Sequence, residues 1–202
     1  MFLNRSPATP REAASIPAGS RRRAARRSPH EALTWRGDHA SEPAQQVLRN
    51  TLRSACEVIG AQRGFILQTR DEPALEVVCA HHVSPRDLLD IVLGCAARAL
   101  HQSLVHGGLG LADRLGLILP QLDGSFEENA PAVVAVPLEL GCPQRGVMCL
   151  LRADPPRVLG ELDIEILEAL AEQAALALRA ANQQSALSRL AASLHALSPQ
   201  PA

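Results

Sequence analysis

The sequence predicts an α+β fold, in which helices cover a central sheet. Amphipathic helical patterns flank several short apolar segments of strand length. Two of these segments, 132–140 and 145–152, are apolar at nearly every position instead of alternating with polar residues. In a sheet, this pattern indicates that both faces are covered. One cover is expected to be helical, and the other face needs a cover of its own.

The part of the chain before residue 80 predicts a helix followed by a hairpin. Residues 43–59 are expected to form the helix, because apolar side chains recur there at steps of four and three until Gly60 ends the pattern. Residues 63–69 and 75–79 are short apolar segments on either side of a turn-like stretch that contains Pro73. These two segments are therefore predicted to pair as strands.

A second helix is predicted to begin at Ser84, which precedes Pro85 at the position of a helix cap. Its apolar positions are expected at Leu88, Ile91, Val92, Cys95 and Ala99. A short strand is expected around 103–106. Residues 107–130, which are rich in glycine, are expected to form a long irregular insertion of the kind that often binds ligands.

The two strands 132–140 and 145–152 are expected to form another hairpin, and a long helix is expected from Asp163 until Pro199. The helix carries a heptad pattern, which is typical of a coiled coil, and polar Gln173 and Gln183 interrupt it. The members of this pattern are Leu162, Ile166, Ala169, Gln173, Leu176, Ala180, Gln183, Leu187, Leu190, Leu194 and Leu197. The helix is expected to pack on the sheet up to Asn182 and to project beyond it afterwards.

Composition excludes several classes of protein. The 202 residues have a formal charge of −1, and all 20 basic residues are arginine, so mechanisms that need a P-loop, kinase or Schiff-base lysine are excluded. No apolar stretch approaches the length of a membrane span. The five cysteines form no C-x-x-C pair and lie in apolar segments, which is typical of reduced thiols in a cytosolic core. We therefore expect a cytoplasmic protein.

The chain is expected to have three parts: a disordered, arginine-rich arm over 1–40, a domain over 41–182, and a C-terminal helical extension over 183–202 that ends in a short tail. Residues 1–30 carry seven arginines and one glutamate, and they have almost no apolar periodicity. Such a segment cannot offset its chain entropy by burial and is expected to be disordered. It could contact nucleic acid, an anionic membrane or an acidic partner, act as a transit peptide, or be a solvated extension.

The order of predicted elements, together with particular phrases, resembles the GAF domain family. The phrases are AQRGFIL at 61–67, VPL at 136–138, GVMCL at 146–150 and the closing helix at 163–182. The resemblance covers about residues 43–182. It implies a central antiparallel sheet of five to six strands, with the N- and C-terminal helices on one face. It also implies a small-molecule pocket on the other face, with a roof made by the middle helix and the insertion.

Ligand-binding residues are expected on the strands and the insertion that would form this roof. The candidates are His81, His106, Leu111, Phe126 and Val134. Their mostly apolar character favours an apolar or mixed ligand over a nucleotide. We expect no catalytic residue, metal or cofactor, because at most two of the candidate ligands around Cys79 converge, fewer than a zinc site requires.

The specialised members of the family carry residues that this chain lacks. Cyclic-nucleotide GAF domains have a lysine-containing phrase, whereas Phe126 stands here in a chain without lysine. Bilin-binding members attach the chromophore through a cysteine that is usually followed by histidine, and no cysteine here has that neighbour. Free methionine sulfoxide reductases of this fold use a reactive cysteine, which Cys95 loosely resembles, although no second cysteine lies in the insertion.

The sequence thus favours a non-catalytic regulatory module that binds an unknown small molecule and homodimerises through its terminal helix. Its signal is expected to pass to a separate protein, such as a kinase or a transcription activator. Two alternatives stay open: a methionine sulfoxide reductase dependent on Cys95, and a ligandless dimerisation scaffold whose arginine-rich arm contacts DNA or an acidic partner.

Overall fold

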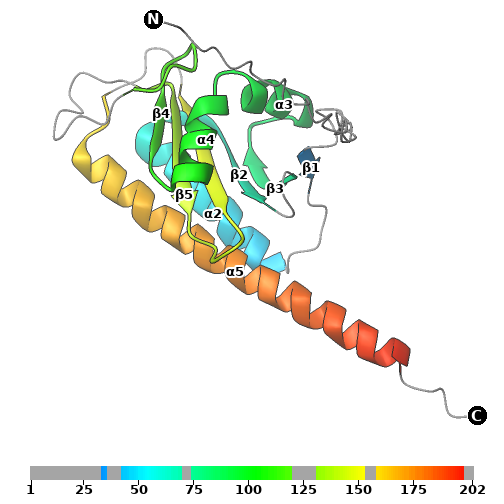
Figure 1. Ribbon diagram of the computed structural model, residues 1–202. Coiled ribbons are helices and arrows are strands. Elements are labelled where there is room, and N and C mark those ends of the chain that lie inside the picture. Colours follow the sequence, from blue (N-terminus) through cyan, green and yellow to red (C-terminus); the bar gives the residue numbers. More distant parts are fainter. Residues whose placement is uncertain (1–32, 36–41, 70–73, 120–130, 153–157, 198–202) are drawn as a thin grey trace, which may run out of the picture.

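The computed structural model describes residues 33–35, 42–69, 74–119, 131–152 and 158–197 (Figure 1). In chain order the elements are β1 (Leu33–Trp35), α2 (Glu42–Ile59), β2 (Ala61–Thr69), β3 (Leu75–His81), α3 (Pro85–Leu93), α4 (Ala97–His106), β4 (Gly110–Ala112), β5 (Val133–Leu138), β6 (Gly146–Arg152) and α5 (Glu161–Leu197).

The strands form one six-stranded sheet in the order β1-β3-β2-β6-β5-β4. All neighbouring strands are antiparallel except β1 and β3, which are parallel. In the centre of the sheet Phe65 pairs with Cys149, and Val136 pairs with Met148. The predicted α+β fold and antiparallel sheet are confirmed, with one parallel strand at an edge.

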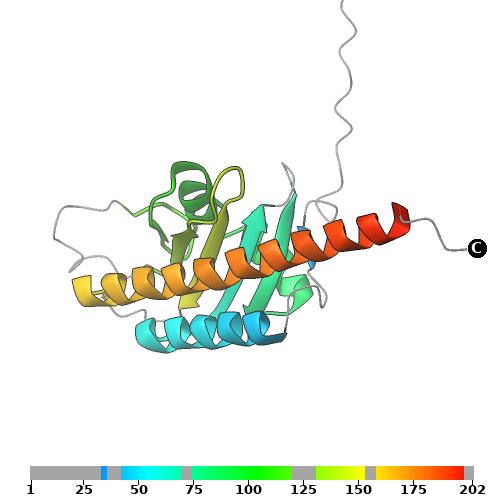
Figure 2. The same cartoon turned by 90° about the horizontal axis from the view of Figure 1, so that it is seen from below.

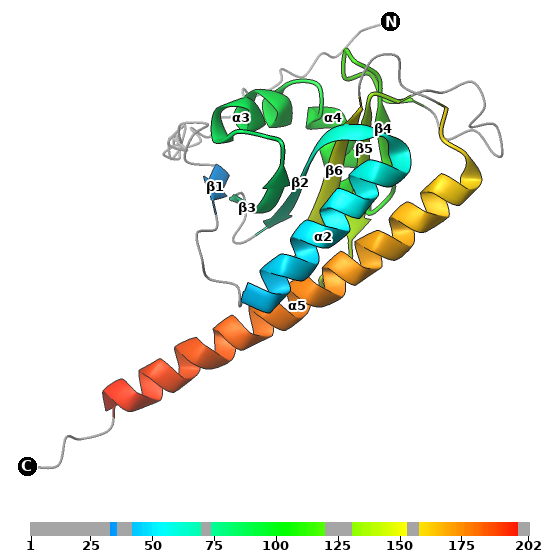
Figure 3. The same cartoon turned by 180° about the vertical axis from the view of Figure 1, so that it is seen from behind.

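The first and last helices, α2 and α5, lie side by side on one face of the sheet (Figures 2 and 3). Leu48 and Leu52 of α2 and Leu167 and Leu178 of α5 are buried there against the sheet. These α2 residues belong to the apolar repeat seen in the sequence, so burial of that stripe explains why the segment folds as a helix.

The opposite face of the sheet is covered by α3 and α4, which form a second apolar core with the strands. Alternation along the strands distributes the side chains between the two faces: Phe65 and Leu67 point to this core, whereas Ile66 points to α2 and α5. Because both faces are covered, strands that are apolar at every position are buried throughout, as predicted.

Two expectations for the middle of the chain are wrong. Residues 103–106, expected as a strand, form the last turns of α4. The helix expected to run continuously through Ala99 is broken, since the amides of both Gly94 and Ala96 bond to the carbonyl of Ile91 and end α3 there. The axes of α3 and α4 consequently differ by 75°, which places Cys95 at the break between them and not on a helical stripe.

The two ends of the described domain compare differently with expectation. Leu33–Trp35, within the arm that was expected to be disordered, forms β1 on the edge of the sheet; residues 1–32 lie outside the described residues. At the other end α5 runs without a break past Asn182, as expected for the long terminal helix. At about 1.5 Å per residue this 37-residue helix is about 55 Å long, and its last turns extend past the sheet (Figure 1).

Candidate functional site

The structure does not bring the four described candidates for ligand binding together into one site. Leu111 and Val134 pair across β4 and β5, but both are buried in the core beneath α2 and α5, not on the predicted roof face. His81 ends β3 beside α2, whereas His106 is exposed at the end of α4. Phe126 lies outside the described residues. Placing Leu111 and Val134 on the roof was therefore wrong, because their positions in the strands point them to the opposite face.

The roof face is closely packed where α4 crosses the sheet. A methyl group at Gly110 of β4 would overlap the main-chain oxygen of Ala99 in α4, so the two backbones are in direct contact. Ser103 strengthens this contact through its hydroxyl, which lies 2.7 Å from the carbonyl oxygen of Ala135 in β5. Within the described residues, no ligand fits between α4 and β4.

Three of the thiols are protonated at neutral pH. Burial raises the pKa of both Cys56 and Cys79 to about 12. Burial also raises the pKa of Cys149 far above its ordinary value. Because the thiolate is the reactive form, these cysteines are poor nucleophiles. Cys95 is half-buried, and Cys142 is exposed.

The heptad stripe on α5 faces solvent along its length. Its five described leucines, Leu162, Leu176, Leu187, Leu190 and Leu194, are between 55% and 67% exposed. The residues of α5 that pack on the domain are a different set: Ile164, Leu167, Ala171, Ala174, Ala175, Leu178 and Ala181. At 3.6 residues per turn, the two sets are centred roughly 170° apart on the helix. The helix therefore has two apolar faces, and the domain covers only one.

A polar network holds α5 at the point where it leaves the sheet. The amide of Asn182 donates to Gln68 Oε1 at 3.1 Å and to Gln144 Oε1 at 3.3 Å. Gln68 in turn donates to the buried carboxylate of Glu76 at 2.6 Å. The network joins α5 to two strands and to the β5–β6 turn, because Gln68 lies on β2 and Glu76 on β3. Such a fully bonded network specifies one helix position.

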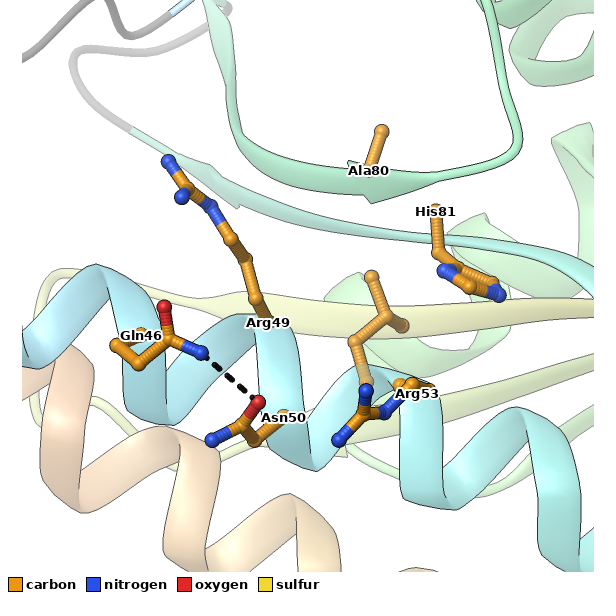
Figure 4. A pocket seen from close by; sticks show the side chains of 7 residues that line it. Gln46, Arg49, Asn50, Arg53, Ala80 and His81 are labelled. Atoms are coloured by element: carbon orange, nitrogen blue, oxygen red, sulfur yellow. Dashed lines mark hydrogen bonds between the residues drawn. The ribbon is translucent and has the colours of Figure 1, made fainter.

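A cleft of about 220 Å³ lies between α2 and the end of β3 (Figure 4). Its polar lining comes from Gln46, Arg49, Asn50 and Arg53 on α2 and from His81 on β3. The pKa of His81 is lowered by partial burial first, and then by the positive charge of His82 and Arg53. The predictions included only His81 from this cleft. The sequence signal for the two arginines was their spacing of four residues on the polar face of α2.

The described residues offer no metal site. Across the described ranges, no three His, Cys, Asp or Glu side chains lie close enough to hold a metal ion.

No single described helix has the length and apolar character that a membrane span needs. The bent pair α3 and α4, taken together, is long and apolar enough by length and composition alone.

Solved structures share this architecture at low sequence identity. The GAF-B domain of DevS from Mycobacterium smegmatis is 18% identical, with a TM-score of 0.50, over 71% of this chain and 98% of that domain. A GAF domain/HD domain protein from Geobacter sulfurreducens is 15% identical, with a TM-score of 0.49, over 69% of this chain and 94% of that one. No protein of curated function matches the sequence.

The sequence itself matches the profile of the GAF domain over residues 41–179. This range begins at the start of α2 and ends in the part of α5 that packs on the sheet. It agrees with the resemblance drawn from the phrases at 61–67, 136–138 and 146–150. Since the match spans well over half of the chain, the protein belongs to the GAF domain family.

Proposed function

We propose that this chain is a non-catalytic regulatory GAF module that homodimerises through α5 and transmits a signal to a separate partner protein. The observation that carries the proposal is the exposed heptad stripe on the face of α5 that the domain leaves uncovered. The partner would be of the signalling type, such as a kinase or a transcription activator. The stimulus would be a small molecule bound by the domain.

Burial of the heptad stripe is the driving force for this dimer. Covering a leucine side chain contributes about 1.5–3 kcal/mol, and each protomer offers five partly exposed leucines. A strict seven-residue repeat drifts by about 20° per heptad around a straight helix, so two such stripes stay in contact by winding into a left-handed coil. Gln173 and Gln183 weaken the contact but set the register of the two helices.

The same helix offers a route for the signal. The buried face of α5 packs on the sheet and on α2, and its other face would contact the second copy. A ligand can change the dimer only if it binds one arrangement of these helices more tightly than another. The network around Asn182 lies between the domain and the last turns of α5, so a shift of the domain would reach the dimer at that point.

Substitution of the stripe tests the dimer. The parent chain is expected to have twice the 21.5 kDa mass of one chain in light scattering. Leu190→Asp together with Leu194→Asp is expected to weaken association at least about a hundredfold and to give the monomer mass, because carboxylates would replace apolar contacts between the helices. These side chains lie beyond the domain core, so the circular dichroism spectrum should persist.

Ala192→Asp is the matched control, because it adds the same charge to an exposed position on the other side of the helix. It should leave the dimer mass unchanged. A parent chain that is monomeric at tens of micromolar, or a double variant with the mass of the parent, would overturn the proposed dimer.

A second experiment tests the absence of catalysis. Incubation of the protein with free methionine sulfoxide and dithiothreitol is expected to give no reduction above the protein-free rate. A reductase cycle that begins at Cys95 needs a second, resolving thiol, and burial keeps three of the other four thiols protonated. The readout is mass spectrometry of the amino acid. Turnover by the parent that Cys95→Ser abolishes would show instead a thiol-dependent reductase.

Native mass spectrometry of freshly purified protein would detect the stimulus directly. A retained small molecule of constant mass supports a sensory role. The alternative of a ligandless scaffold predicts only the mass of the chain and its dimer.

A further inference from the structure

The cleft between α2 and β3 has an excess of positive charge. Arg49 and Arg53 lie one helical turn apart on α2 and contribute two guanidinium groups. The only described carboxylate in ion-pair contact with either of them is Glu57, whose Oε1 is 3.8 Å from Arg53 Nε, and both side chains are more than half exposed. The partner of Arg49 is a neutral amide oxygen of Gln45 at 2.7 Å. Among the described residues, Arg49 therefore has no counterion.

Hydrogen bonds hold part of the polar lining in the free protein, and Gln46 donates to Asn50 at 3.0 Å. Arg49 bonds to Gln45, one turn toward the start of α2, whereas Arg53 contacts Glu57, one turn toward its end. The two exposed guanidinium groups therefore point apart in the free protein and have to turn inward to bind a common anion.

His81 lines the other wall of the cleft, and the next residue, His82, takes the left-handed conformation, with φ of 53°; its ring stacks on that of His81 with the centroids 3.9 Å apart. This conformation is strained for a residue with a side chain, and such strain is concentrated at functional sites.

From this geometry we infer that the cleft binds a small anion, a phosphate or polycarboxylate group, between Arg49, Arg53 and His81. Guanidinium groups bind such anions through paired charge-assisted hydrogen bonds. The ring of His81 adds an N–H donor from the strand side. An anion bound there would contact both α2 and β3, whose side chains line the cleft (Figure 4).

The size of the cleft limits the ligand. Pockets for drug-sized molecules are about 300–1,000 Å³, whereas this cleft is about 220 Å³ and open to solvent. A phosphate monoester or a compact di- or tricarboxylate fits this space, with the remainder of the molecule in solvent. The site is separate from the roof face, since α2 covers the opposite side of the sheet.

The inference goes beyond the proposed function, because it adds an anion as a second ligand that acts on the dimer. The helix that carries both arginines packs along α5, which bears the stripe proposed to dimerise. An anion that draws α2 toward β3 therefore acts on the helix next to the dimer contact. The mass measurement above does not depend on this cleft, so failure of one proposal is distinguishable from failure of the other.

The test needs a readout at His81, because the seven arginines in residues 1–30 also attract anions. We expect inorganic phosphate or citrate, added to the full chain at low chloride, to shift the ring resonances of His81 saturably in NMR spectra. The pKa of His81 should rise in the complex, because a bound anion offsets the positive charge of Arg53 and His82. The anion acts in the same direction as the negative charge of Glu57, which already raises this pKa. Saturation by phosphate alone assigns the cleft to phosphate groups, and saturation by citrate alone assigns it to polycarboxylates. Saturation by both means that the cleft accepts either kind of anion.

Arg49→Gln and Arg53→Gln are each expected to weaken this binding about tenfold, because each removes a charged donor. Arg98→Gln is the matched control: it removes the same charge from an exposed position on α4 and should leave the affinity unchanged. Absence of a saturable shift with both anions up to tens of millimolar would overturn the inference. An equal loss of affinity in Arg98→Gln would overturn it as well, because the attraction would then be nonspecific.

Discussion

Gly110→Val is expected to lower the free energy of unfolding by at least about 3 kcal/mol, which is a large share of the roughly 5–15 kcal/mol that holds a typical domain folded. The first carbon of the new side chain would overlap the carbonyl oxygen of Ala99 and would lie 3.0 Å from its Cα atom. Main-chain atoms cannot rotate away as a flexible side chain can. Helix α4 would therefore have to move off β4 and lose the contacts of the second core.

The measurement is urea unfolding followed by circular dichroism, with the midpoint and slope fitted together. Gly108→Val is the matched control, because the first side-chain atom there would meet only Gln102 Nε2 at 3.9 Å; its stability should change by less than about 1 kcal/mol. Parent-like stability of Gly110→Val would mean that α4 yields readily. The space beneath α4 would then be available to a ligand after all.

The hydrophobic pattern predicted α2 and the two apolar strands β5 and β6 well, because in these elements the buried positions follow the period of the helix or strand. The repeat Leu48, Leu52, Ala55 and Ile59 is fully buried in α2, so its period reports the helix directly. The strands that are apolar at every position were predicted for the same reason, since only a sheet covered on both faces buries them.

The middle of the chain was predicted less well, because short apolar segments suit a helix and a strand equally. Ser103 is polar, but its hydroxyl also lies 2.9 Å from the carbonyl oxygen of Gly108, and this contact, like that with Ala135, forms only when the segment is helical and packed on β5. Tertiary contacts of this kind have no counterpart in the local sequence.

In the candidate site too, the sequence shows features that depend on local pattern but not those that depend on tertiary contacts. The side-chain direction of Leu111 and Val134 depends on strand register, which cannot be read from strands that lack alternation. The cleft joins Arg49 to His81 across a helix and a strand, so no local motif marks it. The heptad pattern of α5 was visible, but only the structure shows that the domain packs on its other apolar face.

Arg152→Met is expected to lower the free energy of unfolding by about 4 kcal/mol. Arg152 is buried at the end of β6, where its Nε donates to the carbonyl oxygen of Ile59 at 3.0 Å and its Nη1 donates to that of Pro131 at 3.1 Å. Hydrogen bonds from a charged group contribute about 1.5–3 kcal/mol each, and both buried carbonyls would lose this donor. Methionine retains the length and apolar stem, so the effect reports the donors.

Arg152 also supplies the positive charge that stabilises the C-terminal end of α2. The last turn of α2 has no basic residue of its own, and a cation beside the C-terminal carbonyls of a helix stabilises it through the helix dipole. Its second bond holds Pro131, where the chain enters β5. Differential scanning calorimetry of Arg152→Met should therefore show a transition lowered by more than about 10 °C, whereas Arg98→Met, at an exposed position, should unfold within about 2 °C of the parent. Equal transitions for the two variants would mean that the bonds to Ile59 and Pro131 contribute nothing to holding α2, and with it the arginine cleft, on the sheet.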